Sequence, residues 1–482
     1  MQKKVLCFWI GLIICLSSFA QTVKLTPTQM QEDFDVFQRA LKEAHPGLYR
    51  YTDTTTFTKM FDSLSHSFKR EMTDQEFYQT LTPAIAQIKC GHTKFHPDGK
   101  WTTRYFYATD QLFPWQLYFT QQKVYVLESY AGNLPVAKGT EIIAINGKPV
   151  SEVVSSLLTK IFVDGNNRST RYLELNQGFS AYYANLIGSS PSFQITCRKT
   201  DSTTSSLEVP AVTVSQIEAF EKQHPKPEEP TFQLKFLDNQ TALIRIKVFY
   251  PAQKGDDYEQ FLKESFAQLK TRNIQHLILD LRDNEGGLDR WGAQLYSYLT
   301  DEKFPYYDRL EMTPTHSYSF AQYADMPKFY GILKMLIKKP KNGPHLWTHH
   351  KNLKVQKPQQ NAYLGKLYIL TNGWSFSVTS EFATIAHSHQ RATFIGQEVG
   401  GGYYGNNSGT FIIVKLPHSK FIVGIPMLAY YMAVSGYPYP DHGVIPDHTI
   451  EPSIQDILNH TDRELQFTQD LIKQSSLSSN GN

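Results

Sequence analysis

Strands and helices alternate along the second half of this 482-residue chain, and this alternation constrains the fold more than any other feature of the sequence. Apolar runs such as TALIRIKVF, HLILDL, KLYILT and RATFIG are separated by stretches with helical spacing, among them 257–270 and 377–387. Strands that alternate with helices favour parallel pairing, because the helix carries the chain back along the sheet. We therefore expect an α/β domain at 231–482, in which the long aromatic insertion at 301–362 either covers a site or is inert.

Two regions of different character precede this domain. Residues 21–110 carry apolar side chains at helical spacing, with start signals at Thr26 and Thr73, and they predict an N-terminal helical domain. Residues 111–230 contain strand-like runs and an Asn-Gly pair at 146–147, which favours a tight hairpin turn. The proline-rich stretch QHPKPEEP that closes this region is typical of a linker, so we place a boundary near residue 230.

The N-terminus has the layout of a secretory signal peptide. Two lysines precede the uncharged run VLCFWIGLIICLSSFA, and we predict cleavage after Ala20, with export to the periplasm or the extracellular space. The alternative is an uncleaved anchor, for which the run is short. Lipidation at Cys15 is the weaker interpretation, because Ile14 before it is not a small residue. No other stretch approaches 18 uncharged apolar residues, so we expect no stable membrane insertion once residues 1–20 are removed.

Composition excludes several classes of function. A chain with 41% hydrophobic and 19% charged residues is typical of a globular protein and not of a disordered one. A net charge of +3 without a long basic run does not indicate a surface that binds nucleic acid.

Cys90 and Cys197 remain after loss of residues 1–20, and the sequence leaves open whether they pair or stay free and buried. No His-x-x-x-His or similar cluster is visible, so we expect neither a metal nor a cofactor.

Three separated segments put reactive or backbone-exposing groups at the ends of predicted elements, where open parallel sheets bind ligands. Gly286 and Gly287 follow HLILDL and let a ligand approach backbone N–H groups. Ser377 follows KLYILT at the start of a helix, where it is either a nucleophile beside the N–H of Val378 or only a helix cap. His92 lies in a Gly-His-Thr motif and is either a general base, titrating near ~6.5, or a structural residue.

Taken together, these segments resemble the family of tail-specific (C-terminal processing) peptidases, tricorn core protease and interphotoreceptor retinoid-binding protein. The matching motifs are, in chain order, His45 to Tyr49, Gly91 to Thr93, Asp280 to Gly287, Ser375 to Phe382, Gly396 to Gly402 and Gly443 to Asp447. Each motif alone is modest, but six in order over nearly the whole mature chain are specific. The chain departs from the family pattern at Cys90, where Asp is usual, and at Ser380, where Glu is usual.

The resemblance implies a crotonase/protease-like α/β catalytic domain, with the N-terminal helical domain carrying His92 in front of it. Residues 138–147 also resemble the second half of a PDZ domain, which implies a PDZ-like β module within 111–230. Such a module captures an extended peptide as an added strand or serves only as scaffold. The family's activity implies a serine-type endopeptidase, a hydrolase that acts on peptide or protein substrates through an acyl-enzyme on Ser377.

The resemblance also selects the partners of the nucleophile. No lysine lies between Ser377 and Lys415, which disfavours the Ser-Lys dyad of the tail-specific enzymes. His92 instead matches the base of the tricorn-like branch. That branch has a late glutamate, and Asp441 is the nearest acid in this chain, either as the third member of the relay or as a solvated turn residue. Val378, with Gly286 ranked before Gly287, is expected to form the oxyanion hole.

Two other functions remain open at this point. One branch of the family binds retinoids and fatty acids on the same fold, so a non-catalytic binding protein for peptides or hydrophobic ligands is the first alternative. An esterase that uses the same nucleophile is the second. The motifs carry no information on cleavage preference or oligomeric state.

Overall fold

A mainly parallel sheet forms in the C-terminal half of the chain, as the alternation of strands and helices predicted. The computed structural model describes residues 24–100, 102–120, 123–199, 202–225, 227–313, 318–327, 336–341 and 343–479. The strands of this sheet are, in spatial order, β10 (Phe232–Phe236), β11 (Thr241–Ile246), β12 (His276–Asp280), β17 (Lys366–Thr371), β18 (Thr393–Gly396) and β21 (His448–Thr449). All neighbours pair in parallel except β10, which runs antiparallel to β11. The mixed α/β fold is therefore confirmed.

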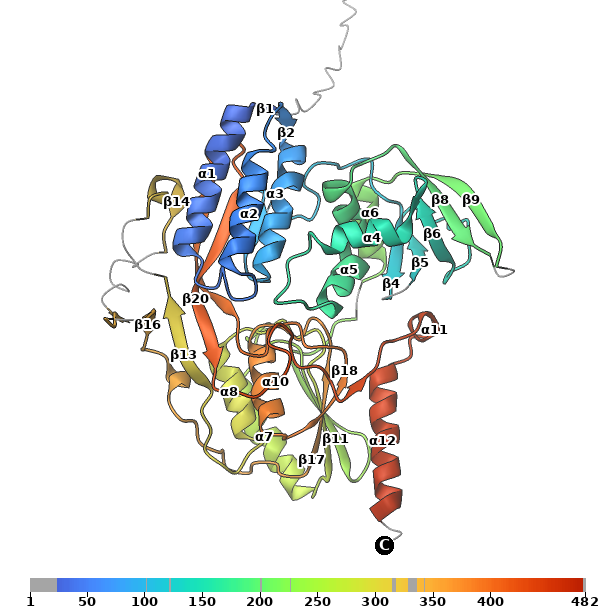
Figure 1. Cartoon of the computed structure of the whole chain (residues 1–482). Helices are drawn as coiled ribbons and strands as arrows, with labels where there is room; N and C mark the ends of the chain where they lie inside the picture. The colour runs from blue at the N-terminus through green and yellow to red at the C-terminus, as the bar shows by residue number, and fades with distance from the viewer. Residues whose placement is uncertain are drawn as a thin grey trace, which may run out of the picture.

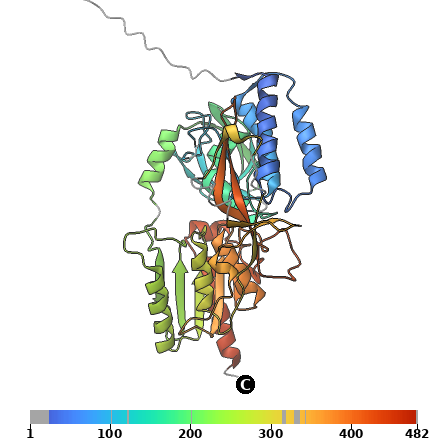
Figure 2. The same ribbon diagram turned by 90° about the vertical axis from the view of Figure 1, so that its left-hand side faces the viewer.

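Helices cover both faces of this sheet (Figures 1 and 2). One face packs against α7 (Tyr258–Thr271), α8 (Asp289–Ser297) and α10 (Val378–Ser388). The other face is covered by α12 (Arg463–Ser479), whose Ile472 packs against Ile278 and Leu370. The inner strands β11, β12 and β17 are buried on both faces, so their sequences read as largely continuous apolar runs that do not alternate with polar residues.

A second, antiparallel sheet is made largely from the last third of the chain. Its strands are, in spatial order, β14 (Ala324–Asp325), β19 (Asn407–Lys415), β20 (Ile422–Met432), β13 (Tyr307–Met312), β16 (His345–Trp347) and β15 (Ile337–Lys338), with β3 (Lys94–His96) also paired to β20. The described part of 301–362 thus contributes four strands to this sheet, along with the short 3-10 turns η1 (Ala321–Tyr323) and η3 (Lys351–Leu353).

The N-terminal helices pack on this second sheet. They are α1 (Pro27–Ala44), α2 (Thr54–Ser65) and α3 (Asp74–Ile88), and a short pair of strands, β1 (Lys24–Leu25) and β2 (Met72–Thr73), joins the starts of α1 and α3. α3 begins with the capping box predicted at Thr73, and α1 begins with the predicted cap at Thr26 and Pro27 at its first position, where Gln29 completes a capping box as well. Phe34 and Phe77 share one core with Ile412 and Val423 of β19 and β20. Residues 24–90 therefore pack against strands from the last third of the chain.

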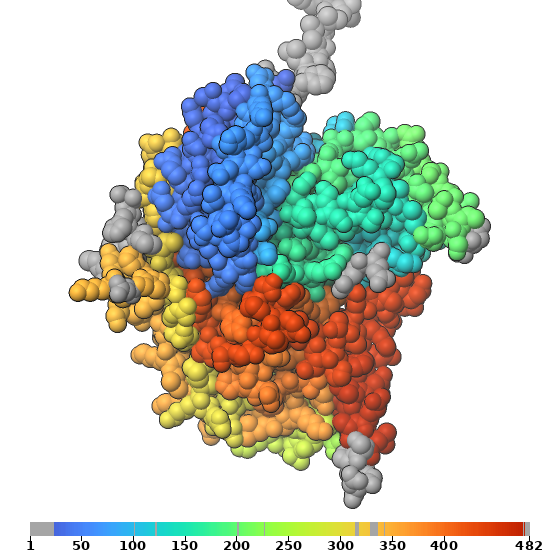
Figure 3. All heavy atoms as spheres, in the orientation of Figure 1, coloured from blue at the N-terminus to red at the C-terminus, as the bar shows by residue number. Residues whose placement is uncertain are grey.

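A third sheet lies beside the N-terminal helices and above the parallel sheet in the view of Figure 1, and in Figure 3 the same segment, cyan to green, adjoins the blue N-terminal segment and the orange to red C-terminal one. It contains, in spatial order, β4 (Trp115–Phe119), β5 (Val124–Ser129), β6 (Glu141–Ile145), β8 (Ser192–Arg198) and β9 (Thr204–Pro210), with β7 (Lys148–Pro149) on β6. The helices in this part are α4 (Val150–Leu158), α5 (Ser169–Leu186) and α6 (Val214–Gln223), while α11 (Ile454–Leu458) lies nearby at the C-terminal end. The Asn-Gly pair at 146–147 makes the predicted hairpin turn, with both residues at positive φ.

Three further predictions concern the signal peptide, membrane insertion and the two cysteines. The signal peptide at 1–20 lies outside the described residues. Within the described part of the chain, no helix combines the length and the apolar character needed to cross a membrane. Cys90 and Cys197 are both buried and free, so they do not pair.

Candidate active site

The carboxyl edge of the parallel sheet brings two of the predicted segments together. β12 and β17 are parallel neighbours, so the loops that follow them leave from the same edge. The N–H of Phe376 donates to the carbonyl of Asn284 at 3.0 Å. The N–H of Gly400, from the loop after β18, donates to the carbonyl of Ser375 at 3.0 Å. The glycine-containing loop and the serine-containing turn are therefore held side by side.

Ser377 lies at the sharp corner between β17 and α10. It occupies the N-cap position of the helix, but its side chain makes no capping hydrogen bond. Its φ of 57° and ψ of −120° are unfavourable for a residue with a Cβ atom, and such strain is typical of turns that present a nucleophile. The neighbouring serines have structural roles, because Ser375 Oγ donates to the carbonyl of Leu281 and Ser380 Oγ donates to the carbonyl of Ser375. Of these three serines, only Ser377 leaves its hydroxyl for another partner.

That partner is His92, which reaches the serine from the far end of the chain. Its Nε2 lies 3.2 Å from Ser377 Oγ. Its ring stacks on Phe376, with ring centroids 4.5 Å apart. Burial, with a smaller contribution from the charge of Lys94, lowers the pKa of His92 to about 3. The expectation of a histidine titrating near ~6.5 is therefore corrected: the ring is neutral at neutral pH and can accept the proton of Ser377.

Gly286 lies against the serine. A methyl group on Gly286 would come within 2.8 Å of Ser377 Cβ and 2.9 Å of the Val378 nitrogen. The N–H of Gly286, however, donates to Asn284 Oδ1 at 3.0 Å, so it is already occupied. Within the described ranges, no acceptor is recorded for the N–H groups of Gly287 and Val378. The expected order of the two glycines as oxyanion donors is therefore reversed. Gly286 lacks a side chain where one would collide with Ser377, and Gly287 has the N–H group that is still available.

Asp441 does not reach His92, so the structure contradicts its expected place as the third member of the relay. Its carbonyl accepts the N–H of Asn166 at 2.8 Å, and its carboxylate accepts the side-chain amide of the same residue. Nδ1 of His92 is buried and has no hydrogen-bond partner among the residues that the structure describes. The physical reason is that Asn166 takes both the carbonyl and the carboxylate of Asp441 as hydrogen-bond acceptors.

Asp164, in that same loop, is an acid that the sequence did not single out. It is 2% exposed, and its Oδ1 accepts the N–H of Gly91 at 2.8 Å. A ring nitrogen of His92, a carboxylate oxygen of Asp164 and the sulfur of Cys90 all lie within 4.8 Å of one another. Burial raises the pKa of Asp164 to about 6. A lone acid in an Asp-Gly-Asn-Asn turn carries no sequence signal beyond that of the turn itself.

Among the residues that the structure describes, these three side chains form the one cluster whose ligand atoms are close enough together to be considered for metal binding. Cys90, His92 and Asp164 offer one sulfur, one nitrogen and one oxygen. Metal binding needs the thiolate, yet Cys90 Sγ donates to the carbonyl of Asn407 at 3.7 Å, and burial raises the pKa of its thiol. The donor set therefore does not fit a preformed metal centre.

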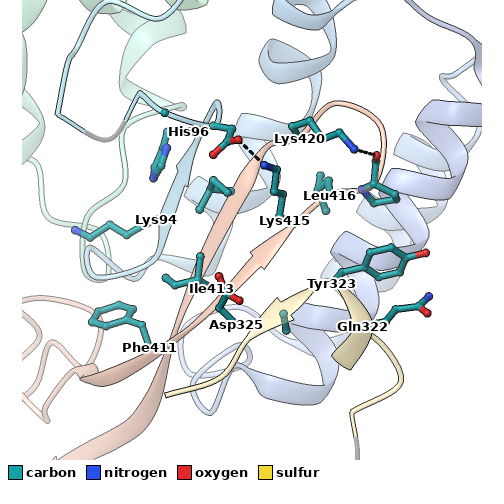
Figure 4. Close-up of a pocket in the computed structure, with 15 residues that line it drawn as sticks. Lys94, His96, Gln322, Tyr323, Asp325, Phe411, Ile413, Lys415, Leu416 and Lys420 are labelled. Atoms are coloured by element: carbon teal, nitrogen blue, oxygen red, sulfur yellow. Dashed lines mark hydrogen bonds and ion pairs between the residues drawn. The ribbon is translucent and has the colours of Figure 1, made fainter. Parts of the chain in front are cut away.

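A groove of about 1100 Å³ begins two residues beyond His92 (Figure 4). It lies on the face of the antiparallel sheet where β3, β19 and β14 meet, and Phe411 and Ile413 form part of its apolar lining. Lys94, Lys415 and Lys420 also line the groove.

Comparisons with known proteins bear on the family and the fold of this chain. Residues 240–450 match the family model described as peptidase family S41. The structure is similar to that of mature CPAF complexed with lactacystin, with a TM-score of 0.63, 13% identity and coverage of 95% of this chain and 99% of that one. A crystal structure of a CPAF mutant gives a TM-score of 0.61 at 13% identity, with 90% and 95% covered. The photosystem II D1 C-terminal processing protease gives a TM-score of 0.41 at 15% identity, with 88% and 94% covered. No curated protein matches the chain.

Proposed function

Residues 240–450 of this chain match the model of peptidase family S41, and on that basis we propose that the protein is an exported serine endopeptidase with Ser377 as nucleophile and His92 as general base. The observation that carries the proposal is the 3.2 Å contact between Ser377 Oγ and His92 Nε2. These residues lie 285 positions apart, and a strained backbone at Ser377 accompanies the contact. A serine that served only as a helix cap would bond its own helix.

The proposed reaction is acyl transfer to water. Ser377 Oγ attacks the carbonyl carbon of the peptide bond while its proton moves to His92 Nε2. The N–H groups of Val378 and Gly287 stabilise the oxygen that becomes negative. The C–N bond then breaks as His92 gives its proton to the leaving amine. A water molecule, deprotonated by His92, hydrolyses the ester on Ser377 and returns the hydroxyl.

Two further parts of the proposal concern how substrate arrives. The sheet of residues 111–230 acts as a PDZ-like module that binds an extended peptide, and its edge strands β4 and β9 are the places where a strand can be added. Residues 1–20 direct export to the periplasm or the extracellular space. The arrangement of the parallel sheet and its helices is of the crotonase/protease-like type, preceded by the N-terminal helices that carry His92.

A serine-directed fluorophosphonate tests the proposal against a non-catalytic binding protein. We expect the purified mature chain to be labelled once, on Ser377, and to digest a mixed peptide library at internal bonds. Mass spectrometry of the labelled peptide and of the digest gives both results. Hydrolysis of simple esters without any cleavage of peptides would favour the esterase alternative. Neither labelling nor hydrolysis would leave the binding protein as the better interpretation.

Gly286→Ala tests the close approach of the glycine loop to the nucleophile. The added methyl group would lie 2.8 Å from Ser377 Cβ and 2.9 Å from the Phe376 carbonyl oxygen, so the turn has to move. We expect kcat/KM to fall about 100-fold or more, because an oxyanion donor displaced from the intermediate loses ~3 kcal/mol. The measurement is peptide hydrolysis alongside a thermal unfolding curve.

Gly255→Ala is the matched control for this variant. Gly255 has a φ of 95°, close to the 98° of Gly286, but a methyl group there meets nothing within 4 Å. Both variants carry the strain of a side chain at positive φ, about 1 kcal/mol each, and only Gly286→Ala also has the clash. Similar activity in the two variants would remove Gly286 from the site.

A further inference from the structure

Two buried polar atoms beside the nucleophile have no hydrogen-bond partner among the described residues: Nδ1 of His92 and Oδ2 of Asp164. Buried polar atoms in native structures are nearly always paired with protein or with ordered water. One of these atoms is a nitrogen that must carry a proton once Nε2 has accepted one, and the other is a carboxylate oxygen. The two atoms are complementary, since His92 Nδ1 can donate a hydrogen bond and Asp164 Oδ2 can accept one.

The two side chains are also close and held as one unit. A ring nitrogen of His92 and a carboxylate oxygen of Asp164 lie within 4.8 Å of each other. Because His92 Nδ1 and Asp164 Oδ2 make no direct hydrogen bond, a separation of this order is one that a single bridging water can span. The other carboxylate oxygen, Oδ1, accepts the N–H of Gly91, the residue directly before His92. The Gly165 N–H, next to Asp164, donates to the carbonyl of Lys89 at 3.0 Å, so the loop is fixed to the end of α3.

We propose that Asp164 is the positioning residue for His92, holding the ring through one bridging water and stabilising its positively charged form, a role that Asp441 does not fill. The inference rests on the proposed function, because it concerns the same proton transfer. When the Ser377 proton reaches Nε2, the ring becomes a cation whose Nδ1 is buried. A carboxylate on its other side lowers the cost of that charge, as the acid of a serine protease triad does.

The groups that face this pair support an ionised carboxylate. Asp164 faces Arg50, whose charge favours the carboxylate, together with Tyr51, the thiol of Cys90 and the backbone N–H groups of Gly91 and Gly402. His92 faces Lys94, whose charge opposes the imidazolium. The nearby anion therefore matters more for the ring than it would in a neutral surrounding.

This arrangement predicts how the rate of reaction at Ser377 depends on pH. Burial raises the pKa of Asp164 to about 6, whereas burial lowers the pKa of His92 to about 3. As the pH falls through about 6, Asp164 gains a proton and loses its charge while His92 is still neutral. The reaction rate should therefore fall with a limb near pH 6 that belongs to the acid and not to the base.

The test follows the rate constant of a fluorophosphonate probe with Ser377 from pH 4.5 to 9, which needs no knowledge of the substrate. We expect Asp164→Asn to react about 100-fold more slowly than the wild type at pH 8, or slower still, and to lose the limb near pH 6. Asn keeps an oxygen for the Gly91 N–H and removes a buried charge, so the unfolding midpoint should stay the same or rise. Asp441→Asn should keep both the wild-type rate and the limb.

Each outcome decides the matter. A wild-type rate that is flat between pH 5 and 8 overturns the proposal without any variant. An Asp164→Asn protein that reacts within threefold of the wild type, or an Asp441→Asn protein that loses the limb, overturns it as well. If wild-type Ser377 fails to react at every pH, the proposed peptidase function itself has failed, which is a different result from a labelled enzyme without the limb.

Discussion

Replacing Ser377 with alanine is expected to abolish peptide hydrolysis and fluorophosphonate labelling while leaving the fold intact. Loss of the nucleophile should lower kcat/KM by ~10⁴-fold or more, because the remaining groups cannot form an acyl-enzyme. The Ser377 side chain makes no capping bond, so the free energy of unfolding should change by less than about 1 kcal/mol. Activity assays and thermal unfolding of the same preparation measure both effects.

Ser380→Ala is the matched control, since it removes a hydroxyl from the first turn of the same helix. Ser380 Oγ accepts the Gly401 N–H and donates to the Ser375 carbonyl, so this variant should lose stability, about 1–2 kcal/mol, and still be labelled. The assignment of the nucleophile would be wrong if Ser377→Ala kept most of its activity, and Ser375 or Ser380 would then be the next candidates.

His92→Ala is expected to have the second largest effect, a loss of at least about 1000-fold in kcat/KM. The pH dependence gives a second measurement. Because burial lowers the pKa of His92 to about 3, the unfolded chain takes up a proton near ~6.5 that the folded chain refuses. The stability that this neutral ring contributes is present above pH ~6.5 and is lost as the pH falls towards 3.

The wild-type unfolding midpoint should therefore decline over that pH range, and it should decline less in His92→Ala. His66→Ala is a suitable control, because His66 is exposed at the end of α2 and its ring bonds the carbonyl of Asp62, in the same helix. Equal activity in His92→Ala and His66→Ala would exclude His92 as the base.

The parts of the fold that could be predicted are those specified by neighbouring residues. Helix caps at Thr26 and Thr73, the Asn-Gly hairpin turn and the apolar runs of the parallel sheet depend on a few adjacent positions, and the structure has all of them. The strand β20 was not expected, because Gly424 and Pro426 within it are ordinarily strand breakers. In the structure, Pro426 pairs with Phe411 where the register of β19 and β20 is irregular, so the missing N–H is tolerated.

The candidate site also contains residues that could be predicted from neighbouring positions and residues that could not. Ser377 and His92 follow from short motifs, and the structure brings them into contact. The acid does not follow from a motif, because the choice between Asp164 and Asp441 depends on how two distant loops pack against each other. The order of the two glycines depends on one side chain, Asn284, whose oxygen accepts the Gly286 N–H. A sequence pattern lists these groups but does not show which hydrogen bonds are already made.

The shared core of the N-terminal helices and the strands β19 and β20 has a consequence for how the protein is made. His92 is synthesised early, but β3, which follows it, pairs with β20, and β20 ends only at Met432. A nascent chain that has not yet reached this strand holds both His92 and Ser377 without the partner that fixes the histidine. We therefore expect the contact between His92 and Ser377 to form only after nearly the whole polypeptide has been translated.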